Sequence, residues 1–539
     1  MNKIFTQLVE SRHFRQDYIN PKYEDLVSPS QLPDIDKAVN RIKKAINAGE
    51  KILIYGDYDV DGVTASTLME QALKMAGVKE VEIMLPDRFI DGYGMSSRLI
   101  KHAKEHQDTL IITVDCGSRN HAIIDELSRE GIDTIVTDHH ECEDEIPKAT
   151  AVINPHRHDY EGAEDLKNLA GVGVAFKLAQ SLVEKNLIKK GQEKWLLDLV
   201  LLGTICDSMV LTKENRILTY YGKIVLEKTK RPGLKELMKN AEVRGITSET
   251  IGFRIGPRLN AAGRLATAKI ALDLLRTTSA TEAARLASKL EELNKARRTE
   301  QHSATKEIIE RLEQTQEKSP VIIETGKWHE GVLGIIAGRL VEEYHQPAFV
   351  LSEVEDGIFK GSGRSFGEFN LAKALEYAKD AIEGGGGHAA AAGVQVKAKN
   401  LDTFKQKINE YYDSLNLKDQ TRFLKSTADV DIVDLKDINL ELMENLSLLE
   451  PFGPGNEEPI FCLKDAFIVD QRRMGESGSH LRLDLKGKDG GVVKTIAFSA
   501  PNDWFNLNEQ IAHTFLIKPT VNEWNGVRSV EARLLDILT

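Results

Sequence analysis

Short apolar runs alternate with amphipathic stretches over the first third of the chain. The runs occupy 52–55, 81–85, 110–114, 134–137 and 151–153, and stretches with helical spacing, such as 64–75 and 121–129, lie between them. Buried strands that alternate with helices are typical of a parallel sheet covered by helices. The pattern therefore predicts an α/β domain, placed at 46–212, after an N-terminal extension at 1–45 that leads into a helix near 36–47.

The pattern changes beyond this domain. Residues 213–317 have mainly helical spacing, and the stretch 280–316, without Pro or Gly, predicts one helix of about 50 Å. We interpret it as a solvated spacer between domains. A second α/β block with two Gly-rich loops is expected at 318–415. Alternating patterns at 480–485, 492–498 and 514–520 predict a small β-barrel within 425–539.

Length and composition agree with several globular domains. A chain of 539 residues is too long for a single hydrophobic core. Its contents of 41% hydrophobic and 29% charged residues are ordinary for a globular protein. No apolar run reaches the roughly 18 residues of a membrane span, and the N-terminus has no apolar signal segment. The four cysteines have no paired spacing. These features predict reduced thiols, a cytoplasmic location and no membrane association.

The net charge of −12 argues against a general nucleic-acid binder, because phosphate binding usually rests on Lys and Arg. Acidic nucleases escape this objection, because their carboxylates bind metal ions and the metals meet the phosphate. The charge therefore leaves a metal-dependent nuclease open.

The first predicted strand runs into a loop with three alternating carboxylates, Asp57, Asp59 and Asp61. Such alternation suits a loop whose side chains converge on cations. An acidic turn and a Ca²⁺ loop are alternatives. The D-x-D-x-D-G pattern of an EF-hand is present, but its twelfth position is Leu68 instead of Glu, and a strand precedes it.

Other apolar runs also end in acids. The run 110–114 leads into Asp115, 134–137 leads into Asp138-His139-His140, and 199–206, which also fits a helix, leads into Asp207. An isolated acid of this kind is often a helix N-cap. In parallel sheets, however, ligands bind outside the carboxyl ends of the strands. The first three groups are therefore expected to meet at one edge of the sheet.

Several carboxylates with one or two imidazoles suit Mg²⁺ or Mn²⁺ better than Zn²⁺. Packed acids stay ionised only with cations between them. Five acids and the histidines suffice for two metal ions, which clamp the attacking and leaving oxygens in phosphoryl transfer. The sequence thus predicts a two-metal phosphodiesterase site.

Asp138-His139-His140 after a strand, with the segment 56–62 upstream, resembles the DHH phosphoesterase superfamily, and further motifs resemble its RecJ family of single-strand-specific DNA exonucleases. These motifs cover most of 45–535 and are Arg88–Gly94, Leu169–Ala175, Gly256–Arg264, Trp328–Gly334, Gly361–Ser365, Gly386–Gly393 and Pro451–Asn456. The resemblance implies an α/β fold: a DHH domain with a parallel sheet, a long connecting helix, a second α/β DHH-associated domain and a C-terminal OB-like β-barrel.

The resemblance also implies an activity and its residues. It implies 5′→3′ hydrolysis of single-stranded DNA to 5′-mononucleotides in DNA repair and recombination, with two Mn²⁺ or Mg²⁺ ions. The implied metal ligands are Asp57, Asp59, Asp61, Asp115, His139 and Asp207. Asp138 and His140 complete the implied catalytic set. Either one of them orients a metal ligand, or His140 acts as an acid toward the leaving oxygen. Many superfamily members carry a histidine where this chain has Tyr55, so the ligand set of the first metal stays open.

The helical region at 213–317 and the second α/β block together supply candidate substrate contacts. Two guanidiniums in a Gly- and Ala-rich loop suit phosphate oxygens, although ion pairs with acids are an alternative. The Gly-rich segments 361–365 and 384–393 look like phosphate cradles, or tight turns. The candidates are Arg258, Asn260, Arg264, Ser362, Arg364 and His388. Trp328 and His329 are candidates for base stacking, with a core position for Trp328 as the alternative. Arg472, Arg473, Arg482 and Lys486 of the barrel are candidates for tracking a strand.

Several alternatives and partners remain open. A phosphodiesterase for short oligonucleotides or cyclic dinucleotides is the main alternative, and a non-catalytic replication scaffold or a manganese pyrophosphatase are weaker ones. Family resemblance implies single-stranded DNA as substrate, a monomer, and a single-strand DNA-binding protein and a RecQ-type helicase as partners. Residue patterns alone predict neither the direction of digestion nor a preference for DNA over RNA.

Overall fold

The computed structural model describes residues 1–92, 94–107, 109–315, 319–355, 357–417, 427–475 and 478–538. The chain divides into two compact units. One unit comprises 1–231, 241–256 and 426–539, and the other comprises 232–240 and 257–425. Among the described residues, no helix combines the length and the apolar character that a membrane crossing requires.

The first unit contains a five-stranded parallel sheet in the order β2-β1-β3-β4-β5. Its strands are β1 (Ile52–Gly56), β2 (Val81–Met84), β3 (Leu110–Val114), β4 (Asp133–Thr137) and β5 (Ala151–Ile153). The central strands β1 and β3 are buried throughout, as their continuous apolar runs require. The predicted parallel α/β sheet is thus confirmed, with each strand within one residue of its apolar run.

Helices cover both faces of this sheet. They are α3 (Ile35–Ala48), α4 (Val60–Met75), α5 (Ser97–His106), α6 (His121–Arg129) and α7 (Gly171–Glu184). Helix α8 (Leu197–Cys206) packs against α4 and α7, and α9 (Lys213–Glu227) packs against α8. Leucines and isoleucines of α5 and α6 share one apolar core with β1, β3 and β4. Helix α4 packs against α7 and α8 as well as β1. A short α11 (Ser248–Thr250) and a π-helical turn at Ile251–Ile255 end this part.

The C-terminal part of the first unit is a β-barrel. It contains β11 (Val430–Ile432), α18 (Leu440–Ser447), β12 (Phe461–Met474), β13 (His480–Lys486), β14 (Val492–Ala497), β15 (His513–Trp524) and β16 (Val527–Leu538). The strand order is β11-β12-β13-β14-β16-β15, and β12 also pairs with β15, which closes the barrel. The expected OB-like barrel is confirmed.

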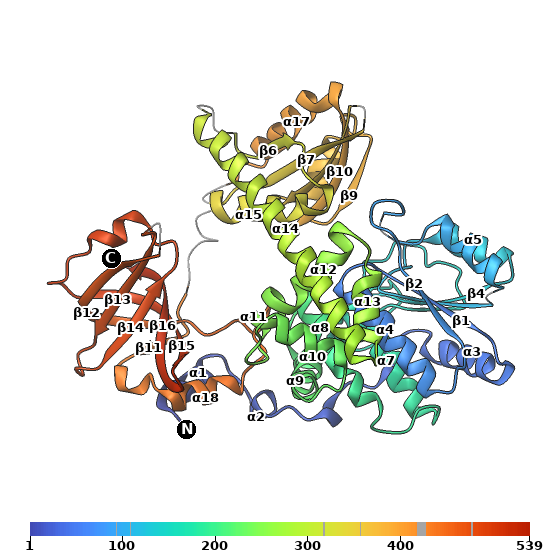
Figure 1. The fold of residues 1–539 in the computed structure, drawn as a ribbon, viewed down its shortest axis with the longest axis horizontal. Helices are drawn as coiled ribbons and strands as arrows, with labels where there is room; N and C mark the ends of the chain where they lie inside the picture. The colour runs from blue at the N-terminus through green and yellow to red at the C-terminus, as the bar shows by residue number, and fades with distance from the viewer. Residues whose placement is uncertain are drawn as a thin grey trace. The chain divides into compact units, whose positions relative to one another are not determined.

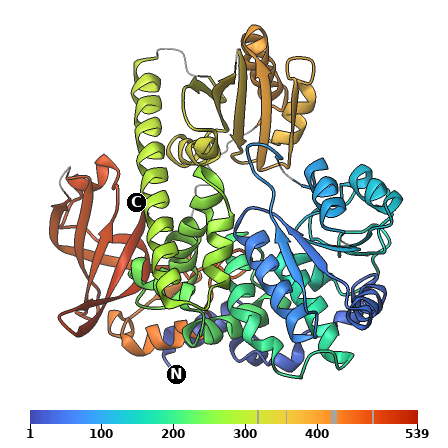
Figure 2. The same ribbon diagram turned by 45° about the vertical axis from the view of Figure 1, so that its right-hand side comes forward.

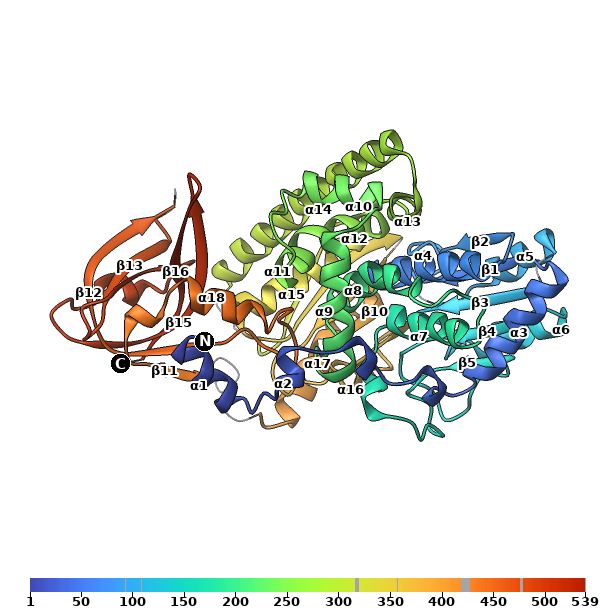
Figure 3. The same ribbon diagram turned by 90° about the horizontal axis from the view of Figure 1, so that it is seen from below.

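The N-terminal helix belongs to the core of this barrel. Ile4, Phe5 and Leu8 of α1 (Lys3–Ser11) are buried with strands β11 to β16, and α1 lies beside α18 and β11 (Figures 1 and 3). A short α2 (Gln16–Ile19) follows. The pattern of 1–45 gave no sign of this pairing, because the partners lie more than 400 residues apart.

A buried arginine ties the barrel to the helices that follow the parallel sheet. Arg216 of α9 donates to the carbonyl oxygen of Leu448 at 2.7 Å and to that of Glu450. Leu211 N donates to Pro454 O at 2.7 Å. A buried guanidinium is costly unless its donors are satisfied, so these backbone acceptors hold the two parts together.

The second unit contains α10 (Pro232–Asn240), α12 (Gly256–Leu265, whose first residue belongs to the other unit), α13 (Lys269–Arg276) and α14 (Ala280–Gln314). Its mixed sheet, in the order β6-β7-β8-β10-β9, consists of β6 (Ile322–Gly326), β7 (Ala348–Glu355), β8 (Ile358–Arg364), β9 (Gly384–Gly387) and β10 (Ala391–Lys397). Helices α15 (Leu333–Tyr344), α16 (Leu371–Tyr377) and α17 (Leu401–Ser414) complete it.

The long helix α14 is a single unbroken element (Figure 2). Its interpretation as a solvated spacer is wrong. Leu286 and Leu290 are buried on the side that packs against α10 and α13, while Ala304 and Ile308 enter the apolar core with α15. The apolar stripe was too narrow to distinguish one packed face from a solvated helix. Gln316, at the predicted end, lies outside the described residues.

Candidate active site

The acidic segment after β1 leads directly into α4. Asp57 follows the strand, Asp59 is the N-cap of α4, and Asp61 lies in the first turn. Asp59 Oδ1 accepts a hydrogen bond from Gly62 N at 3.0 Å, which satisfies an amide that the helix leaves free. Glycine is required at position 62, because a Cβ there would lie 2.5 Å from the Asp57 carbonyl oxygen. The strand end and the cap thus fix three carboxylates within five residues.

The neighbouring strands bring further ligands to the same edge. Asp115 follows β3, and Asp138 follows β4, at the end where Val114 pairs with Thr137. Asp115 is buried and has a left-handed backbone with φ of 61°, a conformation that Asp and Asn tolerate better than most residues. The carboxyl edge of the sheet therefore collects the first three predicted groups.

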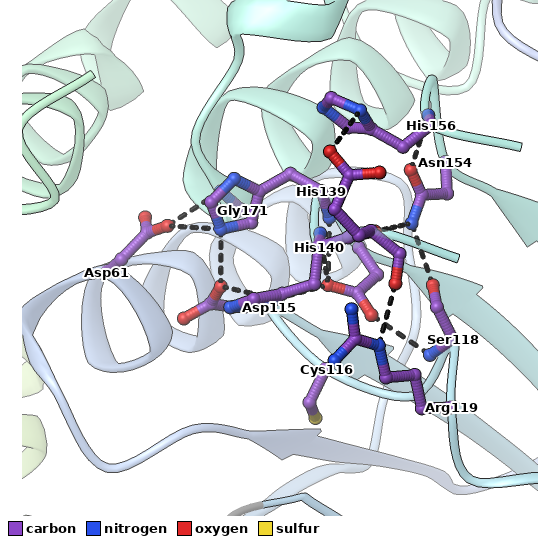
Figure 4. A network of polar contacts seen from close by, with 12 residues as sticks. Asp61, Asp115, Cys116, Ser118, Arg119, His139, His140, Asn154, His156 and Gly171 are labelled. Carbon is purple, nitrogen blue, oxygen red and sulfur yellow. Dashed lines mark hydrogen bonds and ion pairs between the residues drawn. The ribbon is translucent and has the colours of Figure 1, made fainter. Parts of the chain in front are cut away.

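Asp207 reaches this cluster from a helix. It is the C-cap of α8, so the apolar run before it is helical and not a strand. His139 lies at the centre: its Nε2 is 3.1 Å from Asp115 Oδ1, 3.6 Å from Asp207 Oδ2 and 3.8 Å from Asp61 Oδ2. Figure 4 shows His139 between Asp61 and Asp115.

Three overlapping groups of ligand atoms follow from these positions. In each group the ligand atoms lie within 4.8 Å of one another. The groups share Asp115 and His139, and they are Asp57-Asp59-Asp115, Asp61-His139-Asp207 and Asp115-His139-His140. All six predicted metal ligands thus lie in one continuous cluster.

Asp138 has a different environment from the other acids. Its Oδ1 accepts from His140 Nδ1 at 2.8 Å and from His139 N at 2.8 Å, and its Oδ2 accepts from Ser118 N at 2.9 Å. Asn154 supports the pair by donating to His140 O at 2.9 Å and to Ser118 Oγ at 2.8 Å (Figure 4). Asp138 is therefore built to orient His140.

These surroundings drive the pKa values apart. Burial, with the charge of Asp59, raises the pKa of Asp57 to about 8 and that of Asp207 to about 7. Burial and neighbouring carboxylates also raise the pKa of Asp61 and Asp115 well above the ordinary value. Burial and the neighbouring His140 lower the pKa of His139 to about 4.

The Asp138–His140 pair behaves in the opposite way. Although burial opposes both charges, the hydrogen bond and the attraction between the carboxylate and the imidazolium hold the pKa of Asp138 far below its usual value and raise the pKa of His140 to about 9. Near neutral pH, His140 is therefore a cation and His139 is neutral.

The donor set fits divalent cations. Asp57 Oδ1 is buried without a hydrogen-bond partner among the described residues, and three buried acids and the partly buried Asp207 have raised pKa values at the same place. Carboxylate oxygens with a neutral imidazole are ligands of Mn²⁺ and Mg²⁺. Cations would remove both the repulsion and the unsatisfied oxygen.

The start of α7 holds one of these acids in place. Gly171 N and Val172 N donate to the two oxygens of Asp61 at 2.6 and 2.9 Å. These are free amides of a helix N-terminus, which favour a negative charge. A Cβ on Gly171 would lie 2.5 Å from Asp115 Cβ, so the helix approaches the cluster as closely as only glycine allows.

A buried asparagine connects two segments of the site. The side-chain amide of Asn215 donates to Asn168 O at 2.5 Å and to Val210 O at 3.0 Å. Asn168 lies three residues before Gly171, and Val210 lies three residues after Asp207. Asn215 therefore fixes the two segments that orient Asp61 and carry Asp207.

Replacing Asn215 by aspartate is expected to raise the Mn²⁺ concentration that half-saturates the acid cluster by roughly 10-fold. The carboxylate keeps the shape but has no protons for the two carbonyls. Calorimetric titration with Mn²⁺ is the measurement. Asn2→Asp is the matched control, since Asn2 is also buried and donates to Asp437 O, but in the barrel. Equal metal dependence in both variants would contradict this role.

Metal-free protein should lose thermal stability as the pH rises from 6.5 to about 9. Within this window the folded protein keeps protons that the unfolded chain has released, on Asp207 up to about pH 7, on Asp57 up to about pH 8 and on His140 up to about pH 9, so the free energy of unfolding falls with pH. Calorimetry in EDTA tests this, with excess Mg²⁺ as the comparison in which the slope should shrink. A melting temperature that rises with pH in EDTA would contradict it.

The first three predicted substrate residues lie on a helix and not in a loop. Arg258, Asn260 and Arg264 belong to α12, whose Pro257 near the first turn and whose Ala and Leu residues favour a helix. Arg258 Nε is 2.5 Å from Glu291 Oε2 of α14, which is the ion pair considered as the alternative. Arg264 Nη1 donates to Gly331 O at 3.3 Å.

The other three predicted residues lie toward one end of the second sheet. Ser362 and Arg364 lie on β8, so this segment is a strand and not a loop, and Arg364 Nη1 donates to Ser362 Oγ at 3.1 Å. Both side chains lie against Gly334, where a Cβ would be 2.8 Å from Arg364 Nη2, near the start of α15. His388 is in the exposed turn between β9 and β10, close to Ala391, which pairs with Arg364.

Some predicted roles are not supported by the positions found. Trp328 is buried in the core with α14 and α15, and its Nε1 donates to Glu307 at 3.1 Å, so it does not present a face to a base. Tyr55 donates its hydroxyl to Gly94 O, away from the acids. Tyr93 lies outside the described residues. The sequence analysis did not single out Asn154, although it directly follows β5 and so lies at the carboxyl edge of the sheet, where the other site residues were expected.

Comparison with known proteins adds three family matches. The DHH family, N-terminal domain, matches residues 51–204, the DHHA1 domain matches 318–414, and the RecJ OB domain matches 430–536. The Salmonella typhimurium protein named single-stranded-DNA-specific exonuclease RecJ is 34% identical over 94% of this chain and 90% of its own length. The Bacillus subtilis protein of the same name is 34% identical over 96% of this chain, which spans 65% of that protein.

Solved structures agree with the sequence matches. RecJ from Thermus thermophilus in complex with Mn²⁺ has a TM-score of 0.85 and 29% identity, covering 100% of this chain and 76% of that chain. The structure of that protein with Mg²⁺ gives a TM-score of 0.79. The acid and histidine cluster, the three matched domains and the 34% identity over most of both chains place this chain in the family of RecJ single-stranded-DNA-specific exonucleases.

Proposed function

We propose that this chain is a metal-dependent exonuclease that hydrolyses single-stranded DNA in the 5′→3′ direction and releases 5′-mononucleotides. The observation that carries the proposal is the buried cluster in which Asp115 and His139 are shared by overlapping ligand groups. Relatives that are 34% identical over most of this chain are named as single-stranded-DNA-specific exonucleases. The direction of digestion rests on family membership.

Two Mn²⁺ or Mg²⁺ ions would be held by the predicted ligands. Asp57, Asp59 and Asp115 form one group, and Asp61, His139 and Asp207 form the other. When bound, such ions neutralise phosphate charge and lower the pKa of water. The low pKa of His139 keeps its ring neutral, as metal ligation requires.

The Asp138–His140 pair handles a proton in this proposal. Nδ1 of His140 is committed to Asp138 at 2.8 Å, which fixes the ring, and the cation holds its second proton on Nε2. A proton held there is available to the leaving oxygen of the cleaved bond. The backbone amide of Ser118, 2.9 Å from Asp138 Oδ2, helps to keep the carboxylate in the orientation that this pair requires.

The barrel supplies a surface for the strand. One residue from each of β12, β13, β14, β16 and β15 forms a row of paired neighbours across the sheet. Four of the five are cationic and one is an isoleucine, and because they are paired they share the outer face of the barrel. The row is Arg472, Arg482, Ile496, Arg533 and Lys518. Phe498 is 59% exposed, and its ring centroid lies 6.0 Å from the Arg533 guanidinium and 5.4 Å from the His480 ring. An exposed ring within a cationic row is suited to a single strand.

Replacing Phe498 and Arg533 together by alanine is expected to weaken binding of a long single strand by about 10- to 100-fold, because stacking on one base is worth about 1–3 kcal/mol. The rate on a very short oligonucleotide should change little. Trp524→Ala with Arg528→Ala is the matched control, an aromatic and a cation at the tip of the β15–β16 hairpin. Equal weakening in both pairs would argue against this face.

Digestion of 5′-labelled single-stranded DNA tests the proposed activity. With Mn²⁺ or Mg²⁺, labelled mononucleotide should be released at once from the single strand, but not from the same duplex or in EDTA. The same RNA in parallel tests the sugar preference. Turnover of dinucleotides without cleavage of long strands would move the assignment to the alternative, a phosphodiesterase of short oligonucleotides.

We extend the proposal to the cellular setting. A role in DNA repair and recombination, a cytoplasmic location, a monomeric state, and a single-strand DNA-binding protein with a RecQ-type helicase as partners are all inferred from the family. Pull-down of each purified partner and sedimentation of the chain test them.

A further inference from the structure

A second group of metal-type ligands lies outside the active site. Among the described residues, four groups of histidines and acids bring their ligand atoms within 4.8 Å, and three of them are the overlapping groups of the active site. The fourth comprises Glu82 of β2 with His102 and His106 of α5. None of these three residues has a place in the proposed reaction.

The two histidines act from one face of α5. They are four residues apart, which places them one helical turn from each other. Their rings stack, with centroids 4.2 Å apart and planes inclined by 14°. His102 Nε2 lies 3.1 Å from Glu82 Oε1, and His106 Nδ1 lies 3.9 Å from Glu82 Oε2. Three ligand atoms from two elements therefore lie within 4.8 Å of one another.

The carboxylate is kept ionised at this point. Burial opposes its charge, but the hydrogen bond and charge of Lys51, with His102 and His106, lower the pKa of Glu82. Lys51 Nζ lies 2.5 Å from Oε2, whereas Oε1 is the oxygen nearest His102. One oxygen is thus oriented by a lysine, as supporting contacts commonly orient a metal ligand.

This group is separate from the active site along the sheet. Glu82 pairs in register with Leu53 of β1, four residues before Asp57. At 3.3 Å per residue, the two positions are roughly 13 Å apart along the strand. The two sites therefore need not share an ion.

We propose that Glu82, His102 and His106 form a second metal site, for a divalent ion of the Zn²⁺ and Ni²⁺ class, that ties the last turn of α5 to the edge strand β2. Two imidazoles and one carboxylate favour such ions over Mg²⁺. The side chain of His102 is 22% exposed and that of His106 is 46% exposed. The His106 side opens to solvent, so water would complete the coordination of a bound ion.

Calorimetric titration of the untagged full-length chain with Ni²⁺, in excess Mg²⁺, tests the proposal. His106→Ala and His102→Ala should each lower the affinity of one Ni²⁺ equivalent by about 10-fold or more, and Ni²⁺ should raise the melting temperature of the wild type more than that of either variant. Ni²⁺ binding by the active-site cluster is the same in all variants, so it does not contribute to the difference in Ni²⁺ affinity between a variant and the wild type. His106→Ala should keep the nuclease rate in Mg²⁺.

His121→Ala is the matched control. His121 begins α6 and lies 3.5 Å from Glu143, and among the described residues it belongs to none of the groups of three metal-type ligands, so its loss should leave Ni²⁺ affinity unchanged. Should His102→Ala fail to fold, the more exposed His106 and the Glu82→Gln variant decide the question. Ni²⁺ affinity unchanged in His106→Ala and Glu82→Gln would overturn the proposal, whatever the outcome for the nuclease activity.

Discussion

Replacing Asp115 by asparagine is expected to lower the exonuclease rate by about 10³-fold while raising the melting temperature of the metal-free protein. Asp115 belongs to two of the overlapping ligand groups, and metal charge at a phosphate is worth several kcal/mol in the transition state. Burial and the charges of Asp61, Asp59 and Asp57 raise its pKa, so a neutral side chain removes repulsion when no metal is bound.

Asparagine is a sharper test than alanine at this position. With φ of 61°, alanine would add backbone strain that asparagine avoids. Initial rates in Mn²⁺ and melting curves in EDTA are the two measurements. Asp198→Asn is the control, because Asp198 is buried but paired with Arg231 at 2.9 Å, so its loss should lower the melting temperature and spare the metal dependence. An Asp115→Asn protein with full activity would refute the ligand assignment.

Replacing Lys177 by methionine should lower the free energy of unfolding by about 3–5 kcal/mol, because it leaves a buried charge without its partner. Lys177 and Glu214 form an ion pair in which both side chains are almost fully buried. Both also bind the segment before α3: Lys177 Nζ donates to Val27 O at 2.6 Å, and Val27 N donates to Glu214 Oε2 at 2.9 Å.

Urea denaturation, followed in single and double variants, measures this effect. Lys177→Met with Glu214→Leu should recover much of the loss, since no unpaired charge stays buried. Lys185→Met is the control, because the Lys185–Asp36 pair is exposed to solvent and its loss should not shift the midpoint. If Lys177→Met were as stable as the double variant, the buried charge of Glu214 would not be left without a partner when Lys177 is replaced, which would contradict this prediction.

Much of the candidate site could be predicted because it depends on local sequence. Asp57, Asp115 and Asp138 each follow an apolar run, and parallel strands end at a common edge whatever the rest of the chain does. The helix limits at α6 and α14 were likewise within two residues, since periodicity reports helices directly. Resemblance supplied the order of domains.

Other features depend on contacts between distant residues. Short periodic segments were enough to establish which strands form and which acids stand at their ends. Long-range packing was needed to show that α1 completes the core of the C-terminal barrel and that Asn215 connects the segments of Asp61 and Asp207. It was also needed to show that the pKa of Asp138 is lowered while that of Asp57 is raised. Burial and the identity of the neighbours set these outcomes, and neither is encoded in the spacing of residues along the chain.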